Sequence, residues 1–135
     1  MKTIYKIAVL ALLVIGTSNY CCAMPYIVIV PTLQEVQDLG LTIRSDIATN
    51  QTDVWLEFSP HGKLENFTHC ELEVATNGQK LVCATLLPLQ QTSDKVVLHF
   101  SADADHLKMS TLTVFVTLDS MYRRGYRIAV KDFVK

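Results

Sequence analysis

Most of the chain alternates between apolar and polar residues with a period of two, which is the side-chain spacing of a β-strand. The alternation comes in short segments bounded by turn residues, and it predicts about eight strands and almost no helix. The expected strands are residues 26–30, 39–47, 53–58, 67–75, 80–86, 96–100, 111–118 and 126–130. Thr32-Leu33-Gln34-Glu35 has the pattern of a capping box, which predicts one helical turn.

Short, regularly spaced, half-apolar strands are typical of two packed antiparallel sheets. The predicted fold class is therefore all-β, a two-sheet antiparallel sandwich of about seven or eight strands. Its architecture resembles that of immunoglobulin-like sandwiches, a resemblance in strand count and alternation that implies no function. Residues 24–135 are expected to form one domain, because no repeat or Pro/Gly-rich linker divides them.

The first 23 residues have the pattern of a secretory signal peptide. Lys2 and Lys6 precede an apolar run, Ile7–Ile15, and Cys21-Cys22-Ala23 places small side chains before a cut after Ala23. The run is too short to span a bilayer as a helix, which takes about 20 residues. We expect a secreted or periplasmic protein without stable membrane insertion; an uncleaved anchor is the alternative.

Charge is distributed unevenly along the expected mature chain. Residues 24–122 contain five basic and twelve acidic side chains, whereas residues 123–135 contain five basic and one acidic. Arg123, Arg124 and Arg127 alternate with tyrosines, a cluster suited to phosphate, sulfate or an acidic glycan. The alternative is that a basic last strand neutralises acidic neighbours. An acidic secreted protein is a poor candidate for binding nucleic acid.

Cleavage after Ala23 would leave two cysteines, and an oxidising compartment favours a disulfide between Cys70 and Cys83. They flank Asn77-Gly78, a strong hairpin signal. A loop at Thr76-Asn77 would place the cysteines directly opposite each other, whereas a loop at Asn77-Gly78 would make them diagonal. Disulfide geometry favours the first register. The alternative is a redox-active pair, although these two cysteines lack the CxxC spacing that such pairs usually have.

Alternation also places two aromatic residues away from the expected core. Trp55 shares a strand face with Asp53 and Glu57, Phe115 lies among threonines, and Val97 lies beside His99. Together they predict an exposed apolar stripe that would bind a protein or stack against a sugar. In the alternative, another segment covers the stripe or the strand turns Trp55 inward.

Catalytic motifs are absent from the sequence: it contains no GxSxG, HExxH or P-loop, and it implies no cofactor. The one candidate for a metal or hydrolase site is Asp103, Asp105 and His106, which a capped helical turn explains equally well. Asn50 and Asn66 begin N-glycosylation patterns, which matter only in a eukaryotic secretory pathway.

The leading hypothesis is a non-catalytic binding module with an unknown protein or glycan partner. Its binding residues would be Trp55, Phe115, Arg123, Arg124 and Arg127. The first alternative is a structural subunit that assembles through an edge strand, because an unpaired edge is a template for another strand. The second is a small metal-dependent hydrolase.

Overall fold

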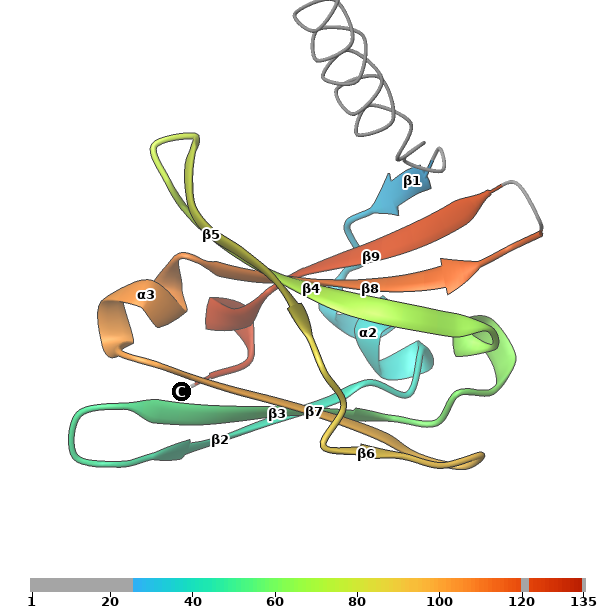
Figure 1. Cartoon of the computed structure of the whole chain (residues 1–135), viewed down its shortest axis with the longest axis horizontal. Coiled ribbons are helices and arrows are strands. Elements are labelled where there is room, and N and C mark those ends of the chain that lie inside the picture. Colours follow the sequence, from blue (N-terminus) through green and yellow to red (C-terminus); the bar gives the residue numbers. More distant parts are fainter. Residues whose placement is uncertain (1–25, 120–121, 135) are drawn as a thin grey trace, which may run out of the picture.

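A computed structural model describes residues 26–119 and 122–134 (Figure 1). The predicted signal peptide, with Cys21 and Cys22, lies outside these residues. The described chain is mostly β, arranged in two sheets of five and four strands. In Figure 1 the five-stranded sheet forms the upper layer and the four-stranded sheet the lower one.

The strand order in each sheet departs from the order along the chain. The five-stranded sheet runs β1 (Tyr26–Ile29), β9 (Arg123–Ala129), β8 (Ser110–Thr117), β4 (Phe67–Thr76) and β5 (Gln79–Leu86). The four-stranded sheet runs β2 (Thr42–Ile47), β3 (Thr52–Phe58), β7 (Val96–Ala102) and β6 (Gln90–Gln91). Neighbouring strands are antiparallel except β1 and β9, which are parallel. The short strand β6 lies where the sequence predicted a loop.

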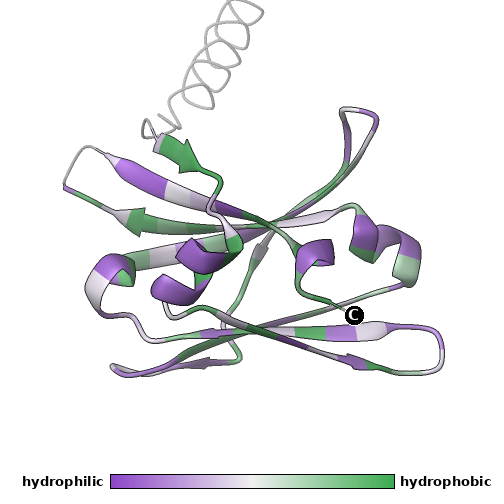
Figure 2. Cartoon of the chain, turned by 180° about the vertical axis from the view of Figure 1, so that it is seen from behind, coloured by the Kyte–Doolittle hydropathy of each residue, from purple (hydrophilic) through white to green (hydrophobic). Residues whose placement is uncertain are grey.

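The two sheets share one hydrophobic core, built as the alternation predicts. Along β3 the side chains of Val54, Leu56 and Phe58 are buried and those between them are half-buried. The matching inward residues of β8 are Leu112, Val114 and Val116, all within the same core cluster. Figure 2 shows apolar and polar residues alternating along the strands.

Short helices connect the strands. They are α2 (Leu33–Asp38), α3 (Ala104–Lys108) and the 3-10 turns η1 (Gly62–Leu64) and η2 (Val130–Asp132). The capping box at the start of α2 is confirmed: the Glu35 amide donates to Thr32 Oγ1, and the Thr32 amide donates back to Glu35 Oε2 at 2.8 Å. Val36 anchors α2 in the core. None of the helices in the described ranges has the length and apolarity to cross a membrane.

The β4–β5 hairpin overturns the register that the cysteines favoured. Its loop is Asn77-Gly78, with φ of 48° and 77°, because a tight hairpin turn needs two positive φ angles. A bulge after Val74 then shifts the pairing by one more residue, so Cys70 lies opposite Leu86.

The same shift separates the two cysteines. Cys83 lies opposite Glu73, three residues from Cys70 along β4, or about 10 Å. An odd separation also puts the two side chains on opposite faces of the sheet, so Cys70 is buried in the core and Cys83 is exposed. Both are free thiols in the structure, and the predicted disulfide is absent because bridged Cα atoms lie within about 7 Å of each other.

Candidate functional site

The predicted apolar stripe is divided between the two sheets. Trp55 and Val97 lie on the outer face of the four-stranded sheet, whereas Phe115 lies on the outer face of the five-stranded sheet. The outer faces of two packed sheets point in opposite directions, so these residues cannot form one surface. The prediction of a single stripe through Trp55 and Phe115 is therefore wrong.

Phe115 is also covered, with only 4% of its surface exposed. His69 stacks on its ring, with centroids 4.6 Å apart and planes 13° apart, and Tyr26 meets it edge-on at 5.4 Å. Gly125 lies opposite Phe115 on β9, and the absence of a side chain there leaves room for the ring. Phe115 thus packs within its own sheet and offers little surface to a partner.

Trp55 is half-buried, between the two outcomes that the sequence left open. The Arg44 guanidinium lies 4.8 Å from the Trp55 ring centroid on one side, and the His99 ring lies 5.2 Å away on the other. These three residues are direct cross-strand neighbours on β2, β3 and β7. Trp55 therefore joins a ladder of side chains on the outer face.

The charges around Trp55 are paired with one another. Glu57 binds Arg44 at 3.1 Å and Lys95 at 3.0 Å, and Asp53 binds His99 at 2.9 Å. The Ser101 hydroxyl also donates to Asp53, and this bond is the first cause of a lowered pKa for the Asp53 carboxyl. This face is a closed network, with few polar groups free to receive a ligand.

The three arginines of β9 divide by strand periodicity as well. Arg123 and Arg127 point outward, where Arg123 lies 6.0 Å from the Phe115 ring centroid and Arg127 lies 4.0 Å from Glu73. Arg124 points to the opposite side, because successive side chains of a strand alternate. The arginine cluster of the sequence is thus not one patch, and Arg124 has separate surroundings.

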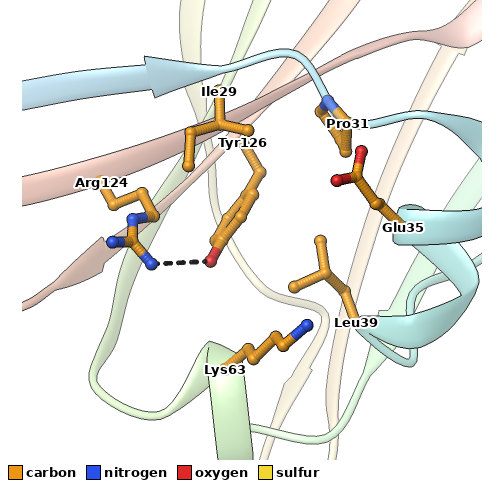
Figure 3. A pocket seen from close by; sticks show the side chains of 7 residues that line it. All are labelled: Ile29, Pro31, Glu35, Leu39, Lys63, Arg124 and Tyr126. Atoms are coloured by element: carbon orange, nitrogen blue, oxygen red, sulfur yellow. Dashed lines mark hydrogen bonds between the residues drawn. The ribbon is translucent and has the colours of Figure 1, made fainter.

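Arg124 lines a hollow of about 190 Å³ at the β1–β9 end of the molecule (Figure 3). Four segments form this feature, hereafter the Arg124 hollow: β1 and the residues after it, α2, η1 and β9. Its lining consists of Ile29, Pro31, Glu35, Leu39, Lys63, Arg124 and Tyr126. Sequence reasoning missed Lys63 and Glu35 as site residues, because nothing local in the sequence links them to Arg124.

The charged groups of the Arg124 hollow are two cations and one carboxylate. Arg124 Nη1 contacts the Tyr126 hydroxyl at 3.5 Å, and its Nε is buried without a hydrogen-bond partner in the described chain. Neither Arg124 nor Lys63 forms an ion pair with any described residue. A buried donor without a partner costs about 1–3 kcal/mol, but the Nε atoms of Arg123 and Arg127 are buried without a partner as well. What sets Arg124 apart is its place beside Lys63 in the hollow.

Glu35, the single carboxylate, is already engaged in the helix cap. Its Oε2 accepts hydrogen bonds from the Thr32 amide at 2.8 Å and the Thr32 hydroxyl at 3.0 Å. These interactions hold the pKa of the Glu35 carboxyl below its ordinary value. The hydrogen bond from the Thr32 amide is the main cause and that from the Thr32 hydroxyl the next, and the positive charge of Lys63 lowers the pKa further. Glu35 therefore stays ionised, and the hollow retains one excess positive charge near neutral pH.

The predicted Asp103–His106 site is a helix cap. The Asp103 carboxylate accepts hydrogen bonds from the His106 amide at 2.8 Å and from the His106 ring Nδ1 at 2.6 Å. Asp103 is thereby the N-cap residue of α3. The nearby Ser110 hydroxyl donates to the His106 carbonyl rather than to the ring, so it is not arranged as a nucleophile. The Asp105 backbone also hydrogen-bonds to the Asp103 carboxyl, as expected at a helix start. No cluster of three or more metal-binding side chains occurs within the described residues.

Comparison with known proteins yields no relative for this chain: no family model matches it, and neither curated proteins nor solved structures give a match.

Proposed function

We propose that the protein is a secreted or periplasmic, non-catalytic binding module on an immunoglobulin-like β-sandwich, and that it recognises an anionic group at the Arg124 hollow. The predicted signal peptide supports export, and two sheets around one core support the sandwich. The observation that carries the proposal is a pair of cations, Arg124 and Lys63, at one hollow without an ion-pair partner in the described chain.

The size of the Arg124 hollow suits one anionic group rather than a whole small molecule. Its volume of about 190 Å³ corresponds to roughly six water molecules of about 30 Å³ each. Pockets for drug-sized ligands hold about 300–1,000 Å³. A carboxylate, sulfate or phosphate group fits this space, and the planar guanidinium of Arg124 is suited to bind it through two parallel hydrogen bonds.

The expected affinity for a free anion is low. Two charge-assisted hydrogen bonds at an open site correspond to about 4 kcal/mol, or a Kd on the order of 1 mM. The natural ligand would then carry its anionic group on a larger glycan or protein, and apolar contacts with Ile29 and Leu39 at the rim would add affinity.

The test is an NMR titration with phosphate, sulfate and acetate at constant ionic strength, using the protein as the cell processes it. We expect saturable shifts at the Arg124 side chain and at backbone amides around the hollow, and we expect Arg124→Gln or Lys63→Gln to remove the backbone amide shifts. Arg127→Gln is the matched control, since it removes the same charge from the same strand on the opposite face. If Arg127→Gln weakens binding as much as Arg124→Gln, the protein attracts anions only by general charge and the proposal is overturned.

A third variant tests the sign of the electrostatics. Glu35→Gln keeps a side chain that can accept the capping hydrogen bonds but removes the one negative charge of the hollow. We expect it to tighten anion binding about 1.4- to fivefold, because an exposed charge pair contributes roughly 0.2–1 kcal/mol. An unchanged or weaker affinity would contradict the placement of the anion beside Glu35.

A further inference from the structure

Strand β5 is a long edge strand whose second side is unpaired within the described chain. It hydrogen-bonds to β4 alone, and seven of its eight residues are exposed. Leu81 and Val82 keep 47% and 46% of their surface exposed. A strand of this kind presents a row of free amide and carbonyl groups beside apolar side chains, which is a template for pairing with another strand.

The other sheet edges are different. Strand β2 carries Arg44 and Asp46, and charges on an edge oppose pairing with another strand. Strand β6 has only two residues, and β1 has only four. By contrast, β5 has one charge, Lys80, and no further charge follows it before Asp94. Among these edges, β5 is the one that is both long and nearly uncharged.

The composition of β5 points to a second copy of the same chain as its partner. In a two-fold antiparallel pair each strand must complement itself, and the two Lys80 side chains then lie at opposite ends of the pair. Parallel pairing would bring the two lysines together. The edge offers almost no charge by which to select a different protein. Val82, by contrast, would lie opposite an apolar residue of the partner, namely Val82, Ala84 or Leu86, in each of the central registers.

Hydrogen-bond geometry limits the position of the two-fold axis. Directly opposed residues of an antiparallel pair share a sheet face. A two-fold axis perpendicular to the sheet must therefore place one residue directly opposite its own copy, with the axis midway between the two. Near the middle of β5 this residue is Val82, Cys83 or Ala84. In each case the two Cys83 side chains, on the outer face, lie directly opposite or on a diagonal of about 7–8 Å.

We propose that two copies of this protein associate through antiparallel pairing of their β5 strands, which joins the two five-stranded sheets into one. The inference rests on the free edge, the exposed apolar residues and the self-complementary charge pattern. It is independent of anion binding, because no residue of β5 lines the Arg124 hollow.

The first test is analytical ultracentrifugation of the processed protein over a concentration series. We expect a reversible monomer–dimer equilibrium, and we expect Val82→Lys to raise the dimer Kd at least tenfold by placing two like charges in the new interface. Ile47→Lys is the control, because Ile47 is 70% exposed and lies on a different edge. A strict monomer at millimolar concentration, or an equal dimer Kd for the wild type and a folded Val82→Lys variant, overturns the proposal.

The second test leaves the core unchanged. The shortest bismaleimide should link the wild-type chains through Cys83, and Cys83→Ser should abolish the linked dimer, with peptide mapping to identify the joined residues. A linkage that survives Cys83→Ser, or no linkage at concentrations where the dimer forms, shows that the copies meet elsewhere. This readout decides the question even if Val82→Lys fails to fold.

Discussion

The close packing of Phe115 against Gly125 makes a sharp prediction about stability. A Cβ atom at Gly125 would lie 3.0 Å from Phe115 Cε1 and 3.0 Å from Thr113 Cγ2. Both distances are shorter than ordinary carbon–carbon contacts of about 3.5–4.0 Å. The ring has little freedom to retreat, because His69 stacks on it and Tyr26 meets it edge-on.

Two opposing effects decide the result of Gly125→Ala. Replacing glycine with alanine stabilises a protein by about 0.4–1 kcal/mol when the site tolerates the methyl group, since the unfolded chain loses freedom. Overpacking a filled site costs about 1–3 kcal/mol. Because the methyl group meets two neighbours, we expect the second effect to prevail, with a net loss of about 1 kcal/mol for Gly125→Ala and a larger loss for Gly125→Val.

Urea unfolding of the single and double variants measures this balance. In a Phe115→Ala background the ring is gone, so the cost of Gly125→Ala should fall by at least about 0.5 kcal/mol, a coupling that a double-mutant cycle resolves. The reasoning is refuted if Gly125→Ala stabilises the wild-type protein, or if its cost is the same with and without the Phe115 ring.

Two further predictions concern the thiols and the outer face of the four-stranded sheet. Burial raises the pKa of the Cys70 thiol to about 12. Iodoacetamide at neutral pH should therefore modify Cys83 and leave Cys70 unmodified until urea is added, as peptide mass spectrometry would show. Equal labelling of both thiols in the folded state would contradict the register of β4 and β5. The hydrogen bond from Lys95, and after it that from Arg44, holds the pKa of the Glu57 carboxyl below its ordinary value of 4.5, so its contribution to stability is present above that pH and is lost as the pH falls through the lower folded-state pKa. Wild type should therefore exceed Glu57→Gln in its urea midpoint at pH 7, and the gap should narrow as the pH falls below 4.5. A gap that is constant with pH would show that the ion pairs contribute nothing.

Local features of this protein followed from the sequence because each depends on residues close together in the chain. The capping box at Thr32 and Glu35 spans only four residues. The Asn77-Gly78 dipeptide likewise indicated a hairpin, although the cysteines favoured a loop one residue earlier than the one observed. The alternation of Val54, Leu56 and Phe58 likewise indicated a buried face without any knowledge of the partner strand. Backbone geometry and short-range hydrogen bonds suffice to specify such features.

The candidate site was only partly predictable. The sequence pointed to Arg124 within a basic segment, but not to Lys63 and Glu35, which other elements bring to the same hollow. It also grouped Arg124 with Arg123 and Arg127, although strand periodicity places those two on the opposite face. The Arg124 hollow exists only where β1, β9, α2 and η1 meet.

The sequence by itself determined that this chain forms short strands with one apolar face, that a hairpin lies around Asn77-Gly78, and which helix start is capped. Tertiary structure alone decided which strands share a sheet, and with it that Trp55 and Phe115 lie on opposite sides of the molecule. It also decided, through one bulged residue, that Cys70 and Cys83 face apart. The physical reason is that pairing between distant strands is set by the whole core, and a shift of one residue reverses the face of every side chain beyond it.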